Sequence, residues 1–431
     1  MPLIVNGEVS IYWRKFAERF ADTNKHISER GFKDLQLHCG YYLYKRKTYI
    51  DRKDLLDKML ETGDNSPVEF IFNDDVFANI DWAVEPDISL DELYKARAQQ
   101  LRDDYDYLIL SYSGGADSHE VLCTFLENNI FIDEIQVVHQ HDLIKNISRN
   151  TMVSDSGLAM MLEFEKVAAP TLKKVMEKSP NTKITLLDSS DFIVKDIVGH
   201  RFSFIGLDKC NNNSSFIVMT TPFVRNFFQH HENNKNLNLG GKRVAFIRGT
   251  EKPSLKMYRN QLKFTFTDVS MHGTKMMQKG DIDEIYTIEN FFWSREVPLI
   301  PIKQSHVIKK VLENDPVFYA QFMINQEKNI RMSEFNKSGI AEEQDFQRKY
   351  SRIIYKHWND NYFKAPKKTK ISGEFLAAEI VFNDTAYKDA LREQREFFYN
   401  KYSVIKNKDL LNRTIVSRRY DIGEINANWY D

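Results

Sequence analysis

The stretch SGGADS at residues 113–118 has the residue types of an anion site. It follows an apolar run at 105–112 and precedes a helix-like pattern at 117–129, so we expect it to join a buried strand to a helix. A glycine pair lets the backbone bend sharply and turn its N–H groups towards a ligand. Because the helix N-terminus adds free N–H groups and a positive dipole end, the sequence predicts a phosphate site here.

The side chains of this loop suggest what accompanies the phosphate. Serine hydroxyls can donate hydrogen bonds, whereas Asp117 would repel a phosphate unless a divalent cation, usually Mg²⁺, lies between them. The alternative is an ordinary tight turn in which Asp117 and Ser118 cap the helix. The strand–loop–helix order favours the ligand site. The residues expected to bind the ligand are Ser111, Ser113, Gly114, Gly115, Ala116, Asp117 and Ser118.

The six-residue string resembles the pyrophosphate-binding loop of the N-type ATP pyrophosphatases, the PP-loop superfamily. Members include the asparagine, GMP, NAD, argininosuccinate and tRNA-lysidine synthetases. With the order of strands and helices, the resemblance extends over about residues 100–315. It implies ATP and Mg²⁺ as cofactors, cleavage of ATP between the α- and β-phosphates, and Asp117 as a catalytic metal ligand. Neither a Walker-type loop nor G-x-G-x-x-G occurs in the chain.

Two later strand ends supply further candidates. In the superfamily the strand end that corresponds to "VVHQHD" (137–142) approaches adenosine, so His139, His141 and Asp142 are candidates for the nucleotide or acceptor pocket. His139 and His141 would share a strand face and could bind a metal. The alternative, strand-end histidines with no ligand role, stays open.

The second strand end is "FIRGTEKPSL" (246–255). Asparagine synthetases have a glycine-acidic loop at the corresponding place that helps bind metal and pyrophosphate. By this resemblance Gly249 and Thr250 would contact the nucleotide, and Glu251 would be a second Mg²⁺ ligand. Lys252 would neutralise charge on the leaving pyrophosphate. An exposed loop is the alternative.

The segment 289–310 could wall the acceptor pocket with Lys303, Gln304 and His306. Core packing of its aromatic residues, Phe291, Phe292 and Trp293, is the more common outcome for such a run.

The elements that must position these residues alternate between strands and helices. Strands are expected at 105–112, 134–140, 183–190 and 242–250, and helices at 117–129, 157–179 and 215–231, with Pro170 dividing the second helix. A further helix is expected at 85–104, with Ser89 as N-cap and Glu92 completing a capping box. The pattern predicts an α/β fold, a parallel sheet with helices on both faces. The resemblance to the PP-loop superfamily implies that this fold is of the adenine nucleotide alpha hydrolase type.

Three regions are expected along the chain: a small N-terminal α+β region at 1–95, the PP-loop ATP pyrophosphatase domain at 96–315, and a mainly helical C-terminal region at 316–431. The chain has 431 residues, 42% of them hydrophobic, and a net charge of -1. No apolar run approaches the roughly 20 residues of a membrane helix, and the N-terminus lacks a signal-peptide layout. Its three cysteines, Cys39, Cys123 and Cys210, form no CxxC pair, so we expect a cytoplasmic protein without disulfides or a cysteine zinc site.

The leading hypothesis is an AMP-forming ligase that adenylates a carbonyl or carboxylate oxygen and forms an amide or amidine C–N bond. Its partners would be a small-molecule or nucleotide acceptor and an ammonia or amine donor. Glutamine hydrolysis in the same chain is not expected, because residue 2 is Pro2 rather than a cysteine nucleophile.

Two alternatives stay open. PP-loop sulfurtransferases and reductases usually use paired or C-terminal cysteines, which this chain lacks. A nucleotide-binding module without turnover would have little reason to keep Asp117. The basic stretches 364–370 and 417–420 could touch a nucleic acid, although a solvated surface is favoured.

Overall fold

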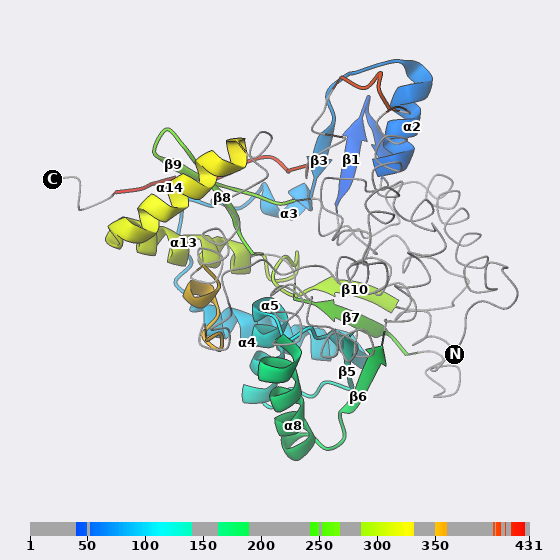
Figure 1. Cartoon of the computed structure of the whole chain (residues 1–431), viewed down its shortest axis with the longest axis vertical. Helices are drawn as coiled ribbons and strands as arrows, with labels where there is room; N and C mark the ends of the chain where they lie inside the picture. Colours follow the sequence, from blue (N-terminus) through cyan, green and yellow to red (C-terminus); the bar gives the residue numbers. More distant parts are fainter. Residues whose placement is uncertain are drawn as a thin grey trace, which may run out of the picture.

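The computed structural model describes residues 40–49, 52–139, 163–188, 242–249, 252–267, 286–331, 350–359, 400, 402–406, 410 and 415–426. A five-stranded sheet lies at the centre of this part of the chain (Figure 1). All its neighbouring strands pair in parallel, in the order β10-β7-β4-β5-β6. The strands are β4 (Tyr107–Ser111), β5 (Glu134–His139), β6 (Lys183–Asp188), β7 (Val244–Arg248) and β10 (Tyr286–Asn290).

The strand order creates one place where connections leave in opposite directions. From β4 the chain steps outward to β5 and then β6, and afterwards it returns to place β7 on the other side of β4. In open α/β sheets, ligands bind beyond the carboxyl ends of the strands at such a switch point. The last residues of the two strands, Ser111 and Arg248, are direct register partners. The loops that follow β4 and β7 therefore meet.

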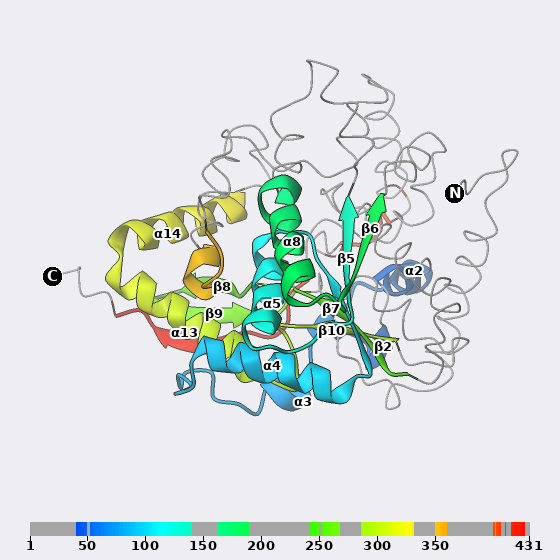
Figure 2. The same cartoon turned by 90° about the horizontal axis from the view of Figure 1, so that it is seen from below.

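Three helices lie on one face of this sheet: α4 (Leu90–Asp104), α5 (Ala116–Glu127) and α8 (Ala169–Lys178) (Figure 2). Right-handed crossovers explain why α5 and α8 share a face, because β4, β5 and β6 advance in one direction across the sheet. The five-stranded parallel α/β sheet confirms the coarse fold prediction. The helix predicted at 215–231, on which coverage of both faces depends, lies outside the described residues.

Local sequence signals set the helix ends. The predicted capping box is present: Glu92 N donates to Ser89 Oγ (3.2 Å) and Ser89 N donates to Glu92 Oε2 (3.0 Å). Pro170 divides its helix as predicted, because a π-helix at Glu163–Ala168 ends where α8 begins and the proline occupies the first turn of α8.

Two antiparallel sheets flank the central one. The first, in the order β2-β1-β3, comprises β1 (Tyr41–Tyr44), β2 (Lys47–Tyr49) and β3 (Glu69–Ile71), next to α2 (Arg52–Thr62). The second, in the order β11-β9-β8, comprises β8 (Ser254–Tyr258), β9 (Gln261–Thr265) and β11 (Tyr420–Glu424). The short helix α3 (Asp74–Phe77) and the longer helices α13 (Leu299–Asn314) and α14 (Pro316–Arg331) complete the described elements.

The described helices and strands cross the boundaries of the three predicted regions. Helix α4 runs through the boundary predicted at residue 95. Strand β11, from the region predicted to be mainly helical, pairs with β9. The division into three regions remains a prediction, and the described part of the last region contains a strand as well as α14.

A cluster of aromatic rings joins these regions. Phe266, fully buried after β9, lies 4.4 Å from Phe72 and 4.5 Å from Phe77 between ring centroids. Trp82 stacks on Tyr420 of β11 at 4.4 Å, and Trp82 also packs on Phe266 at 5.9 Å. Such pairs add to the large apolar area that each ring removes from water. The cluster therefore fixes the flanking sheets to each other.

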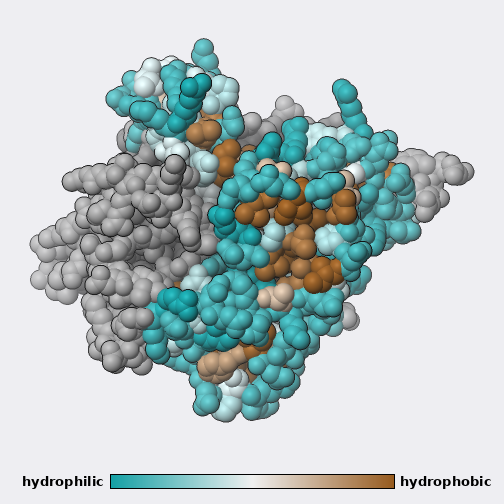
Figure 3. Space-filling model, turned by 180° about the vertical axis from the view of Figure 1, so that it is seen from behind, coloured by the Kyte–Doolittle hydropathy of each residue, from teal (hydrophilic) through white to brown (hydrophobic). Residues whose placement is uncertain are grey.

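On the face seen in Figure 3, the described surface is mostly hydrophilic, with apolar groups gathered in places. Among the helices in the described ranges, none combines the length and the apolarity needed to span a bilayer.

Replacing Phe266 by alanine should lower the free energy of unfolding by roughly 3–5 kcal/mol, since a buried ring is exchanged for a cavity. Denaturant unfolding followed by tryptophan fluorescence measures this. Phe131→Ala is the control, because Phe131 is 40% exposed and its loss should cost under about 1 kcal/mol. Equal effects of the two changes would contradict a central role for the aromatic cluster.

Candidate functional site

The backbone of the loop after β4 requires one glycine. Gly114 has φ of 84°, a left-handed conformation that residues with a Cβ rarely adopt. Gly115, the N-cap of α5, is extended with φ of -72° and ψ of 163°. The loop thus turns sharply at Gly114 and enters the helix directly at Ala116, which leaves the first N–H groups of α5 at the end of the sheet.

The serines order the loop internally. Ser118 Oγ accepts a hydrogen bond from Ser113 N (3.2 Å) and can donate to Gly115 O (3.2 Å). Ser113 Oγ accepts from Gly115 N (3.1 Å). The two hydroxyls, expected to donate to a ligand, also lie 3.2 Å from each other. In this structure they hold the loop in one conformation.

Gly249, directly after β7, presses against the start of α5. A Cβ on Gly249 would lie 2.9 Å from the carbonyl carbon and oxygen of Asp117 and from Ser118 N. Real Cβ atoms essentially never approach backbone atoms so closely. Gly249 is therefore required by steric fit, and its contact shows that the loops after β4 and β7 pack directly against each other.

The same approach brings Lys252 to Asp117. Lys252 Nζ lies 2.7 Å from Oδ1 and 2.8 Å from Oδ2 of Asp117, and hydrogen-bond geometry is met at Oδ2. Both side chains are partly exposed, at 21% and 30% respectively. The structure thus places the two predicted catalytic residues side by side, each neutralising the other.

The remaining predicted residues lie at strand ends or outside the described residues. Ser111 ends β4 beside the loop, and His139 ends β5 in register with Asp188. Thr250, Glu251, His141 and Asp142 lie outside the described residues. The aromatic residues of segment 289–310 pack in the core, as do two of its polar residues: Phe291, Phe292, Trp293, Gln304 and His306 are all buried.

Those polar residues have structural partners. Gln304 donates to Tyr94 Oη (2.9 Å), and His306 Nε2 contacts Trp82 O at 3.0 Å. Lys303 Nζ pairs with Glu85 Oε1 at 2.6 Å. The described structure therefore supports core packing for this segment rather than a pocket wall.

The first turns of α5 contain a buried polar group that the sequence did not single out. His119 Nδ1 lies 3.0 Å from Tyr112 Oη, and its Nε2 lies 3.5 Å from Cys123 Sγ. Burial, and then the nearby charges of His357 and Lys174, lower the pKa of His119 to about 4. Burial and the neighbouring Glu120 raise the pKa of Cys123 to about 12. At neutral pH both groups are therefore uncharged.

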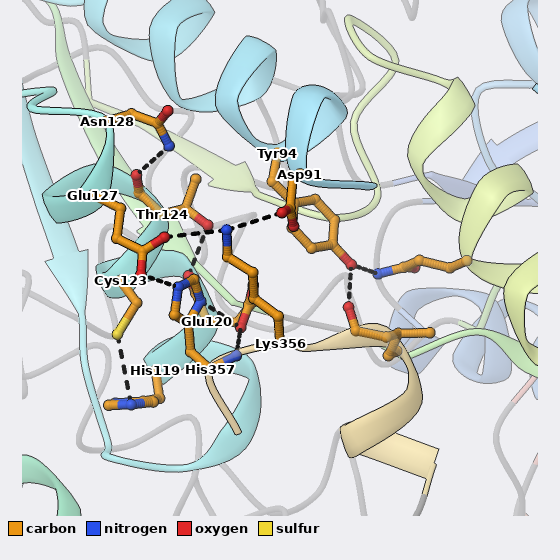
Figure 4. A network of polar contacts seen from close by, with 12 residues as sticks. Asp91, Tyr94, His119, Glu120, Cys123, Thr124, Glu127, Asn128, Lys356 and His357 are labelled. Carbon is orange, nitrogen blue, oxygen red and sulfur yellow. Dashed lines mark hydrogen bonds and ion pairs between the residues drawn. The ribbon is translucent and has the colours of Figure 1, made fainter. Parts of the chain in front are cut away.

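Residues 350–359 form a third side of the site. Tyr355 from this segment lies against Lys252. His357 lies between Glu120 and Glu127 of α5 (Figure 4). These residues are separated from α5 by more than 200 positions in sequence, for example 237 between Glu120 and His357. No local pattern in the sequence could have indicated the contact.

The arrangement suits a phosphorylated ligand with a divalent cation. The loop presents backbone N–H groups at a helix N-terminus, and Asp117 already holds a positive charge against its carboxylate, supplied by Lys252. Carboxylate oxygen is the ligand type that Mg²⁺ prefers. Within the described ranges, no group of three or more His, Cys, Asp and Glu side chains gathers to hold a metal. Phosphate oxygens would have to supply further ligands.

Comparison with known proteins assigns no family: no family model and no curated protein matches this sequence. The resemblance to the PP-loop superfamily therefore stays a prediction from the SGGADS string.

Gly249→Ala should disorder the loop at 113–118, because the added methyl group must displace the backbone of Asp117 and Ser118. Hydrogen exchange of peptides that cover the loop should become faster, with a stability loss of roughly 1–3 kcal/mol. Gly63→Ala is the control: Gly63 has φ of 64° but open space around it, so only backbone strain is added. Unchanged exchange in the loop of Gly249→Ala would contradict the steric argument.

Proposed function

We propose that this protein is an ATP pyrophosphatase that adenylates a carbonyl or carboxylate oxygen of an acceptor and forms a C–N bond, releasing AMP and pyrophosphate. The observation that carries the proposal is the position of the SGGADS loop. It lies at the switch point of a parallel sheet and is closed on one side by Gly249. A nucleotide triphosphate is the ligand that such a site suits best.

The roles proposed for the chain's residues follow from their chemistry. Backbone N–H groups of the loop would bind phosphate oxygens, and Asp117 would hold Mg²⁺, which neutralises charge on the triphosphate. With a cation held by the Asp117 carboxylate, Lys252 would lose this partner. Its ammonium group would then be available to neutralise the departing pyrophosphate.

The acceptor and the nucleophile follow only from the superfamily resemblance. A small molecule or a nucleotide would be adenylated, and ammonia or an amine would displace AMP. Sulfur transfer is the second candidate, and the environment of Cys123 disfavours that thiol as its nucleophile. A nucleophilic cysteine needs a thiolate, whereas the pKa of Cys123 is raised to about 12 by its burial.

The first test is the identity of the products. With acceptor and amine donor present, ATP and Mg²⁺ should yield AMP and pyrophosphate, because the site is proposed to direct attack to the α-phosphate. Chromatography of α-labelled ATP after reaction separates AMP from ADP. Accumulation of labelled ADP together with inorganic phosphate would contradict the proposal. Since turnover can require the acceptor, calorimetric binding of ATP and Mg²⁺ is measured in parallel.

Replacing Asp117 by asparagine should reduce pyrophosphate release at least about 100-fold, because the neutral amide removes a metal ligand without changing the side chain's size. Asp106→Asn is the matched control. Asp106 also pairs with a cation, Arg243, but lies just before the amino end of the same strand, far from the loop. Its variant should keep wild-type activity. Comparable rates for Asp117→Asn and the wild type at saturating Mg²⁺ would show that Asp117 only pairs with Lys252 and takes no part in the reaction.

A further inference from the structure

Residues 350–359 are anchored to three elements around the site. Tyr350 Oη donates to Pro253 O (2.7 Å), the residue after Lys252. The carbonyl of Ile354 accepts from Tyr94 Oη of α4 (3.0 Å). His357 N donates to Glu120 Oε2 of α5 (3.1 Å). The segment therefore bridges the β7–β8 connection and the helix that follows the SGGADS loop.

Tyr355 lies at the centre of this bridge and against both charged groups of the site. The side chain is fully buried, and its ring packs on Phe292 with centroids 5.0 Å apart. Lys252 Nζ lies 5.8 Å from the centroid of the Tyr355 ring. Burial, followed by the nearby Asp117 carboxylate, keeps the pKa of Tyr355 well above its usual value, so the hydroxyl stays neutral.

The ring limits where the Lys252 ammonium can go. A cation within about 6 Å of an aromatic centroid is attracted to the ring face, and the attraction grows when water is excluded. Lys252 is held between this ring and the carboxylate of Asp117, so its long side chain is confined to one region of the site.

His357 fixes the segment to α5 through two carboxylates. Its Nδ1 lies 2.9 Å from Glu120 Oε2, and its Nε2 lies 2.6 Å from Glu127 Oε1. The contact at Nε2 is close but is not aligned as a hydrogen bond. An unprotonated ring nitrogen would turn its lone pair towards an ionised carboxylate oxygen and be repelled, so two such neighbours favour a proton on both ring nitrogens. The geometry is therefore that of an imidazolium ion bridging two carboxylates.

We propose that residues 350–359 are a positioning clamp: Tyr355 holds Lys252 opposite Asp117, and the imidazolium of His357 keeps Tyr355 in place by bridging Glu120 and Glu127. Its importance for ATP chemistry rests on the proposed function, whereas the clamp itself is a property of the fold. Tyr355 and His357 are positioning residues in this account, and neither is required to touch a substrate.

The clamp should weaken as the pH rises. Burial by itself lowers the pKa of His357, but the hydrogen bonds and charges of Glu120 and Glu127 outweigh it and leave the pKa raised. The other charged or titratable groups around His357 are Lys356 in the same segment, Asp91 of α4 through Lys356, and the neutral His119 of α5. A raised folded-state pKa gives stabilisation that is complete below about pH 6.5 and is lost as the pH passes the folded value.

The decisive experiment measures how reactive the Lys252 amine is, because this readout needs no nucleotide. Competitive amine labelling with mass spectrometry compares Lys252 with the exposed Lys256 in the same molecule. At about pH 6, His357→Gln and Tyr355→Leu should each raise relative labelling of Lys252 by roughly threefold to tenfold, the range that loss of a cation–π contact predicts. Tyr355→Phe keeps the ring and should keep the wild-type value.

Lys310→Gln is the matched control. It removes a positive charge from α13, where Lys310 is 62% exposed and pairs with Glu85 rather than with a carboxylate of the clamp. Labelling of Lys252 should be unchanged in this variant. The ratio between His357→Gln and wild type should fall towards one as the pH rises past the folded pKa of His357, since the wild type then loses the proton on His357.

Two results would overturn the clamp: unchanged Lys252 labelling in both Tyr355→Leu and His357→Gln, or a ratio between His357→Gln and wild type that does not depend on pH. A ratio that does not depend on pH is expected if His357 only packs in the fold and its charge has no effect on Lys252. Circular dichroism of each variant identifies any that fail to fold. If Tyr355→Leu does not fold, the comparison of His357→Gln with Tyr355→Phe and the wild type still decides the test.

Binding of ATP and Mg²⁺ by the same variants separates this inference from the proposed function. If the wild type binds no ATP, the proposed function fails while the labelling result still decides the clamp. If the wild type binds and cleaves ATP but labelling is the same in every variant, the clamp fails and the proposed function stands. Both inferences are supported if Tyr355→Leu shows more labelling of Lys252 and a lower kcat than Tyr355→Phe.

Discussion

The contact between Gly249 and the backbone at Asp117 and Ser118 determines the geometry of the whole site. Parallel pairing of β4 with β7 brings the two strand ends together, but any side chain at position 249 would hold the loops apart. With glycine there, the chain passes so close to α5 that Lys252 reaches Asp117 three residues later. The charge pair is thus a consequence of a steric constraint, and the serine hydrogen bonds preserve the loop that meets it.

Different parts of helix α5 contribute to the candidate site, to the core and to the contact with His357. Its N-terminus faces the candidate ligand site, and its apolar side packs in the core through Val121, Leu122 and Phe125. On its remaining side, His119 of α5 and the neighbouring His357 are in opposite protonation states. Burial keeps His119 neutral, whereas Glu120 and Glu127 favour the charged form of His357. The charge on His357 in turn helps to lower the pKa of His119, so the two groups are electrostatically linked.

Features set by local sequence were predictable, and features set by distant contacts were not. The SGGADS loop, the capping box at Ser89 and the division at Pro170 all follow from short-range chemistry. The hairpin β8–β9 turns at Arg259 and Asn260 with positive φ, without the Asn-Gly or Asp-Gly pair that usually indicates such a turn. Tyr355 and His357 could not be found at all, because long-range packing alone brings them to the site.

The most direct test is the structure of the protein crystallised with ATP and Mg²⁺. The account predicts a triphosphate on the backbone N–H groups of residues 113–118, a Mg²⁺ ion bound by Asp117, and Lys252 moved from that carboxylate to a phosphate oxygen. A loop that stays empty at saturating nucleotide, with Asp117 and Lys252 still paired, would contradict it. So would a nucleotide bound anywhere other than the ends of β4 and β7.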